Sequence, residues 1–151
     1  MDGGMDDPRE EIRRVINDRI DAIRSKDAAS AVACLAPEIL AFEMVPPLVS
    51  PAGAARDADA FGAWLAGFEE IDVEPVELAI EADERIGFAA ALHHLVGTRI
   101  GGHAVSLWMR STLCFLRDCE GWKIVHSHTS VPFYPGREPN AALDLQPQST
   151  D

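Results

Sequence analysis

The spacing of hydrophobic residues changes partway along this chain, and that change constrains the fold more than any single motif. In the first part they recur at helical intervals, as in the stripe Ile12, Val15, Ile16, Ile20 and Ile23. From about residue 76 they alternate with polar residues, which is typical of strands with one solvated face. We therefore expect helices first and a sheet afterwards.

Three aspartates mark the expected helix starts. Asp7 stands before Pro8, which suits the first position of a helix. Asp27 precedes a short second helix that stops near Pro37, and Asp57 precedes a third. On the third helix four residues are expected to share a face: Phe61, Trp64, Leu65 and Phe68.

Five segments are expected to form strands: 39–45, 76–83, 86–99, 104–117 and 121–133. Pro46-Pro47 ends the first strand, and glycine-containing turns join the later ones into an antiparallel meander. The prolines of the tail, residues 135–151, exclude regular structure there. This order predicts an α+β fold, in which three N-terminal helices cover one face of a curved, mostly antiparallel sheet. We expect one domain, residues 1–151, with its core at about 8–134.

Charge and cysteine content limit the partners and the compartment. The net charge is −12, which opposes binding to nucleic acid or to anionic membrane surfaces. No segment approaches the roughly 20 apolar residues of a membrane span, and the start of the chain lacks a signal-peptide pattern. Cys34, Cys114 and Cys119 show no spacing of a disulfide framework or zinc site, so we expect a cytoplasmic protein without a metal.

The strand near the C-terminus carries the most informative polar residues. Alternation places five side chains on one side: Trp122, Ile124, His126, His128 and Ser130. Such a polar line is costly unless it faces a pocket or finds partners. His126 and His128 could exchange protons with a ligand near neutral pH, or could be hydrogen-bonded within the core. A metal would need further ligands, such as Glu43 or His94, and the set is incomplete.

Glu43 stands in an otherwise apolar segment. Desolvation there would raise its pKa toward the range of a general acid or base. The alternative is an ion pair with Arg110, which shares a strand face with Trp108 and Thr112. Of the adjacent His93 and His94, only one can face the pocket, and the grouping of His94 with Leu92 and Val96 favours His94.

Aromatic residues are expected to line the pocket or to fill the core: Trp64, Phe68, Trp108 and Trp122. An aromatic wall favours an apolar or planar ligand. The opposite face of the long strand is apolar: Val105, Leu107, Met109, Leu113 and Phe115. If the helices cover the other face, this one predicts a homodimer formed sheet to sheet.

The segments that carry a family resemblance are Phe42–Leu48, Gly53 before the Trp64 helix, Trp108–Thr112 and Gly121–Phe133. Together with the tail they make residues 8–146 resemble the nuclear-transport-factor-2-like superfamily, in its SnoaL-like, ketosteroid-isomerase-related subgroup. The resemblance implies a cone-shaped, cystatin-like fold. It also implies an acidic base near Glu43. The isomerases' oxyanion-hole tyrosine and acid are absent, because Tyr134 is the only tyrosine and Thr112 stands at the acid's position.

Two other activities of the superfamily resemble this chain less. SnoaL-type polyketide cyclases use an aspartate beside histidines, and no aspartate accompanies His126 and His128 in their strand. Epoxide hydrolases use an Asp-Arg-Asp set, of which only Arg110 is present.

The sequence thus predicts a protein that binds a small, largely apolar organic ligand. Any catalysis would be cofactor-independent proton transfer of the isomerase or cyclase type, by Glu43, His126 or His128 with Arg110. Ligand contacts are expected from seven residues: Trp64, Phe68, His94, Trp108, Thr112, Trp122 and Ser130. The alternatives are a non-catalytic ligand-binding or accessory dimer, and a purely structural association module.

Overall fold

The computed structural model describes residues 7–148, apart from the side chain of Leu78. Its helices are α1 (Pro8–Arg24), α2 (Ala28–Ala33), the 3-10 helix η1 (Ala54–Arg56) and α3 (Ala58–Ala66). Its long strands are β1 (Leu35–Phe42), β2 (Phe68–Ala82), β3 (Ile86–Arg99), β4 (Ala104–Asp118) and β5 (Gly121–Ser130). Two short strands follow, β6 (Phe133–Tyr134) and β7 (Asn140–Ala141).

The three expected helix starts are confirmed. The side chain of Asp7 accepts a hydrogen bond from the backbone N–H of Arg9 at 3.0 Å. Asp27 and Asp57 each accept one from the third residue after them, at 3.2 and 3.0 Å. Each bond satisfies an N–H that the helix itself leaves unpaired, which is why these helices begin where they do.

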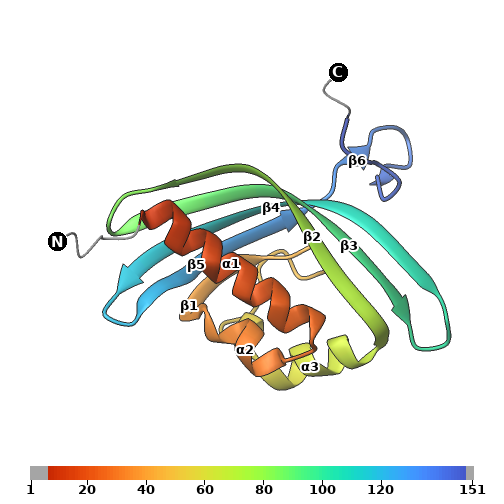
Figure 1. The fold of residues 1–151 in the computed structure, drawn as a ribbon. Coiled ribbons are helices and arrows are strands. Elements are labelled where there is room, and N and C mark those ends of the chain that lie inside the picture. The colour runs from red at the N-terminus through yellow and green to blue at the C-terminus, as the bar shows by residue number, and fades with distance from the viewer. Residues whose placement is uncertain (1–6, 149–151) are drawn as a thin grey trace.

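The five long strands form one sheet in the order β1-β5-β4-β3-β2. Strands β2 to β5 are antiparallel neighbours, as the expected meander requires, whereas β1 pairs with β5 in parallel. The sheet curves, and all the helices lie on one side of it (Figure 1). We call that side the inner face and the opposite side the outer face.

Several expected boundaries were wrong. Strand β2 begins at Phe68, eight residues before the expected start, because the long strand folds directly back from α3. Strand β1 covers 35–42 instead of 39–45. The second helix therefore ends at Ala33, before the expected end near Pro37. Pro37 is accommodated in β1 because this strand lies at the sheet edge, where its pairing with β5 is irregular. The tail was expected to lack regular structure, but β6 pairs with β7.

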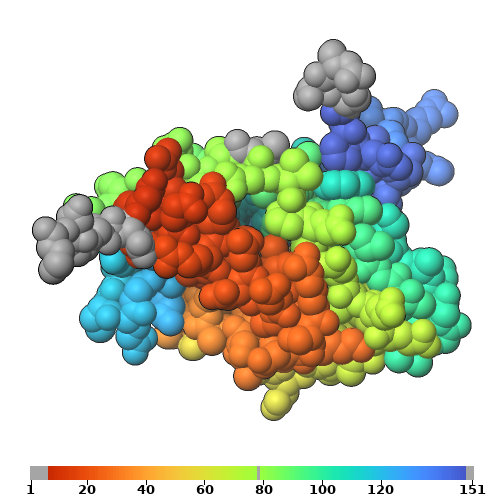
Figure 2. Space-filling view, in the orientation of Figure 1, coloured from red at the N-terminus to blue at the C-terminus, as the bar shows by residue number. Residues whose placement is uncertain are grey.

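Two clusters of buried side chains fill the space between the helices and the inner face. One joins Ile12 of α1 with Phe115 and Ile124 of the sheet, none of which is exposed to solvent. The other joins Ile23 of α1 with Leu65 of α3 and with the neighbouring sheet residues. The helical layer covers the middle of the sheet in the space-filling view (Figure 2).

Two bulges, one in β5 and one in β2, change the face of the sheet to which the residues after them point. In β5, Ile124 pairs with Phe115 but His126 pairs with Cys114, so Val125 is an extra residue. In β2, Glu77 pairs with Ala91 but Ala79 pairs with Ala90, so one residue is again extra. Because side chains alternate, one extra residue reverses the face of everything beyond it.

The apolar face that predicted a homodimer is the inner face instead. Phe115 is fully buried, and Val105, Met109 and Leu113 pack against the core clusters. The helices cover this face, so the residues named for association are core residues. No helix among residues 7–148 is long and apolar enough to cross a membrane.

Two glycines of similar burial should respond oppositely to alanine. A Cβ at Gly97 would lie 2.6 Å from the Glu70 carbonyl oxygen and 3.1 Å from Phe68 Cδ1, so Gly97→Ala is expected to cost about 1–3 kcal/mol. A Cβ at Gly62 on α3 meets only Ala28 Cβ at 3.4 Å, so Gly62→Ala should stabilise by about 0.5–1 kcal/mol. Urea denaturation of both variants tests this, and a stable Gly97→Ala protein would contradict the close approach of β2 to β3.

Candidate functional site

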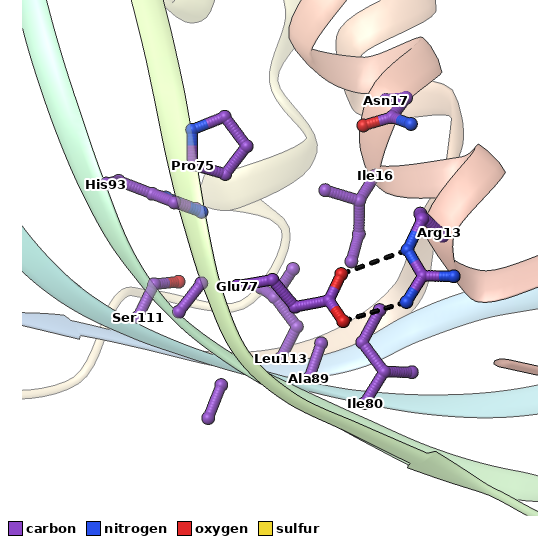
Figure 3. Close-up of a pocket in the computed structure, with 12 residues that line it drawn as sticks. Arg13, Ile16, Asn17, Pro75, Glu77, Ile80, Ala89, His93, Ser111 and Leu113 are labelled. Atoms are coloured by element: carbon purple, nitrogen blue, oxygen red, sulfur yellow. Dashed lines mark hydrogen bonds and ion pairs between the residues drawn. The ribbon is translucent and has the colours of Figure 1, made fainter. Parts of the chain in front are cut away.

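A cavity of about 150 Å³ lies between α1 and strands β2, β3 and β4. Its walls are mostly apolar, and Figure 3 shows the residues that line it. They are Arg13, Ile16, Asn17, Pro75, Glu77, Ile80, Ala89, Ala90, Ala91, His93, Ser111 and Leu113. The alanines of β3 leave the space open, because methyl side chains do not reach the helix.

An ion pair joins the two walls of the cavity. Arg13 of α1 donates to both carboxylate oxygens of Glu77, from Nε at 2.9 Å and from a terminal nitrogen at 2.7 Å (Figure 3). This hydrogen bonding lowers the pKa of Glu77 and raises that of Arg13, which also contacts Glu10. Glu77 continues the inner-face alternation of Val73 and Pro75, and the bulge that follows it returns Ile80 to the same face. Both charges remain paired and ionised at neutral pH.

His93 is the titratable residue in the cavity wall formed by β3. It faces Ile16 and Asn17 of α1 across the cavity in Figure 3. Burial lowers the pKa of His93, and the positive charge of Arg19 lowers it further. The imidazole is therefore neutral at pH 7, which leaves one ring nitrogen able to accept a proton.

A second polar group of the cavity wall is the hydroxyl of Ser111, which shares the inner face with His93. Ser111 lines the cavity and is buried, and it pairs with Ala91 on one side and Thr129 on the other. Within the described residues, neither the His93 ring nor the Ser111 hydroxyl has a hydrogen-bond partner, and no fully buried side-chain nitrogen or oxygen is unpaired. The unpaired atoms of His93 and Ser111 are therefore accessible from the cavity.

The structure brings most of the expected site residues together, but on the outer face. They are His94, Trp108, Arg110, Thr112, His126, His128 and Ser130, which occupy adjacent positions in the register of β3, β4 and β5. The bulge at Val125 separates His126 and His128 from Trp122 and Ile124, which stay on the inner face. None of the seven lines the cavity.

These outer-face residues contact one another. His94 stacks on Trp108 with ring centroids 4.4 Å apart, and its Nε2 lies 2.8 Å from the Ser106 hydroxyl. Arg110 Nε donates to the Ser130 hydroxyl at 3.3 Å. His126 Nδ1 lies 2.7 Å from the carbonyl oxygen of Leu40 at the edge strand. The structure thus gives them mutual partners across the outer face.

The expectations for Glu43 do not hold. Glu43 follows the end of β1 and is exposed, so the burial on which its role as a proton-transfer group depended is absent. The chain leaves the sheet at Phe42, so Glu43 is not part of an apolar strand. Among the described residues, no ion pair joins Glu43 to Arg110, which bonds to Ser130 instead.

The other aromatic residues expected to contact a ligand belong to the core and its rim: Trp64, Phe68 and Trp122. Phe68 and Trp122 are buried, and Trp122 Nε1 donates to Glu11 at 3.1 Å. Trp64 is 43% exposed and stacks on Phe61 with centroids 5.7 Å apart. The described residues hold no group of three or more potential metal ligands.

Sequence reasoning missed His93, Ser111, Glu77 and Arg13 for identifiable reasons. Deciding whether His93 or His94 faces the cavity requires knowing which face of β3 the helices cover, and the sequence does not show this directly. A signal existed in the small residues Ala89 and Ala91, because they share the face of His93 and leave room above the sheet. Glu77 could not be placed, because the bulge beside it leaves no mark in the alternation.

Comparison with known proteins agrees with this architecture. The family model of the SnoaL-like domain matches residues 12–134. A nuclear-transport-factor-2-like protein of unknown function from Pseudomonas putida superposes with a TM-score of 0.78 at 24% identity, covering 91% of this chain and 95% of its own. A proposed ketosteroid isomerase from Shewanella frigidimarina gives 0.63 at 21% identity, covering 84% and 98%. A proposed dehydratase from Streptomyces avermitilis gives 0.67 at 14% identity, covering 80% and 93%.

The helices on one face of a curved antiparallel sheet define the cystatin-like, nuclear-transport-factor-2-like fold. The family model, which covers most of the chain, shows that the chain belongs to the SnoaL-like family. No curated protein matches the chain.

The lowered pKa of His93 makes the stability of the protein depend on pH. The unfolded chain binds a proton at the ordinary pKa of about 6.5, whereas the folded chain binds it only at lower pH. Stability contributed by neutral His93 is therefore present above about pH 6.5 and is lost as the pH falls toward the folded pKa. Replacing His93 with asparagine should flatten this part of a stability profile measured by urea denaturation. The matched replacement of His103, in the exposed β3–β4 turn, should leave the profile unchanged.

Proposed function

We propose that this protein binds a small, largely apolar organic molecule in the cavity and transfers a proton to or from it without a cofactor, with His93 as the base. The observation that carries the proposal is a neutral histidine, accessible from an apolar cavity, whose ring has no protein partner. A base of this kind accepts a proton when the substrate carbon lies within reach.

The other cavity residues support the same chemistry. The walls formed by Ile80, Ala89 and Leu113 suit an apolar body, and a few polar groups suffice to orient it. A cavity of about 150 Å³ accommodates one aromatic ring with a short substituent. The Ser111 hydroxyl can donate to a ligand carbonyl, and so polarise it as the neighbouring carbon loses its proton.

The comparisons are compatible with this class of reaction. Similar structures include proteins proposed to be a ketosteroid isomerase and a dehydratase, and both activities require proton transfer. The alternative is a non-catalytic binding or accessory protein that uses the same cavity. The two differ in one respect, since only an enzyme needs the basicity of His93.

Proton abstraction beside a carbonyl gives a direct test. The probe is 2-tetralone in deuterium oxide, and the measurement is deuterium incorporation at the carbon beside the carbonyl, followed by NMR. We expect exchange above the buffer rate, and His93→Gln should reduce the excess by about 10²–10⁴-fold. His126→Gln on the outer face is the matched control and should leave the rate unchanged.

Binding is measured in the same samples from the NMR shifts of the cavity alanines. Binding without exchange would favour the non-catalytic alternative. Ala91→Leu, which fills the cavity, should abolish both signals, whereas Ala104→Leu, at the exposed start of β4, should abolish neither. Exchange that survives in His93→Gln would contradict the assignment of the base.

We also propose that two copies associate through the outer face. No described element covers this face, and it carries exposed Phe88 and Leu40 in the row of Cys114 and His126. Its charges are separated, with Glu70 and Glu74 on β2 and with Arg110 near β5. In a two-fold arrangement the acidic edge of one copy meets the basic side of the other, so the face is complementary to itself.

Light scattering coupled to gel filtration tests this association. The wild-type chain of 16.4 kDa should elute with about twice that mass. Phe88→Asp should shift the equilibrium to the monomer, because a charge replaces an exposed apolar side chain of the face. Leu48→Asp, in an exposed loop, is the control and should remain dimeric. A monomeric wild-type protein would contradict the proposed association through the outer face.

The cytoplasmic location expected from the sequence is likewise a proposal. Cys34, Cys114 and Cys119 are free thiols in the described structure. Free thiols persist in a reducing compartment, which supports that location.

A further inference from the structure

Arg19 is a cation in the middle of the apolar stripe of α1. Ile12 lies two turns before it and Ile23 one turn after it on the same helix face, and both are buried. Ile16, one turn before Arg19, lines the cavity. Arg19 therefore reaches into the interior between α1, α2 and the sheet, where a charged group is expensive to place.

The protein uses few of the donors of Arg19. Its Nε donates to the carbonyl oxygen of Ala31 on α2 at 3.2 Å, and its guanidinium lies 6.0 Å from the centre of the Phe61 ring. No ion pair to Arg19 and no hydrogen bond from its two terminal nitrogens exists within the described residues. Four of the five N–H donors of a guanidinium are thus without a protein acceptor.

Arg19 and the proposed base share one electrostatic environment. Burial is the main cause of the lowered pKa of His93, and the charge of Arg19 lowers it further. Burial raises the pKa of the Cys34 thiol, and the charge of Arg19 opposes that rise. Burial lowers the pKa of Arg19 itself, and the charge of Glu43 only partly opposes it. Arg19 does not itself line the cavity, but it lies one turn beyond Ile16 and two residues beyond Asn17, which do, so its long side chain starts at the edge of the space beside His93.

We propose that Arg19 binds a carboxylate of the ligand, so that the ligand is a small organic acid with an apolar body. The inference rests on the proposed function of the cavity and adds the chemical class of its ligand. A carboxylate accepts two parallel N–H bonds from the fork of a guanidinium, which matches the unpaired donors of Arg19. The apolar body then lies against the alanines of β3, beside His93.

A structural role for Arg19 predicts different behaviour. If the bond to Ala31 and the contact with Phe61 were its purpose, removing the charge would destabilise the protein. If the charge is kept for a ligand, the empty protein carries the cost of a partly buried cation without an anionic partner among the described residues. Arg19→Met keeps the length of the side chain and removes the charge, so it separates the two roles.

The test compares two probes of nearly equal shape, phenylacetate and phenylacetamide, by NMR titration of the full chain. We expect wild-type protein to bind the acid at least roughly tenfold more tightly than the amide. Arg19→Met should bring this ratio close to one without weakening the amide. Arg85→Met, in the exposed turn between β2 and β3, is the matched control and should keep the wild-type ratio.

Each result has a defined meaning. Equal binding of acid and amide to the wild type, or a preference for acid that persists in Arg19→Met, would overturn the role of Arg19 while leaving the cavity as a ligand site. Binding of neither probe, together with no exchange of 2-tetralone, would instead overturn the proposed function and the inference with it.

Thermal denaturation without ligand gives an independent readout. The melting temperature of Arg19→Met should rise by roughly 2–4 °C, and a fall of that size would show that Arg19 is structural and overturn the inference. Arg19→Lys retains the charge but not the fork, so it should show an acid preference between those of the wild type and Arg19→Met.

Discussion

The contact between Ile12 and the inner face of the sheet is the interaction on which the remaining structure depends. Ile12 is fully buried against Phe115 and Ile124, and it lies so close to Gly87 that any side chain there would collide with it. This contact holds α1 across the sheet, so that the next turn of the helix stands above the alanines of β3 without touching them. Close packing at one end of the helix thus permits an open space further along it.

The two bulges then decide which chemistry enters that space. Without the extra residue in β2, Ile80 would not share the inner face with Glu77, and the cavity would lose one of its apolar walls. Without the extra residue in β5, His126 and His128 would continue the buried side of Trp122 and Ile124. A single backbone irregularity therefore has a larger effect on the site than a change of side chain, because it reverses a whole row.

This explains what the sequence could and could not predict. Aspartate caps act within a few residues, and the strand pattern is repeated many times, so the three helices, the meander and the family were all predictable. The location of the cavity was not predictable, because the face to which a strand residue points changes with a shift of one position in register. His93 and His94 are chemically identical and adjacent, and only the register with β4 shows that His93 shares the inner face with Ser111. Arg19 was hidden for another reason, since a charged residue within a helical stripe resembles a solvent-facing interruption of it.

Strand β3 also separates the shape of the site from its chemistry. The residues whose methyl groups set the volume are Ala89 and Ala91, while the basic group belongs to His93, two positions after Ala91. Enlarging one of these methyl groups shortens the space available to a ligand and leaves the proton-accepting atom where it is. Divergence among relatives of this protein can therefore proceed by exchanging small apolar residues on one strand, so that the shape of the cavity changes while the imidazole is retained.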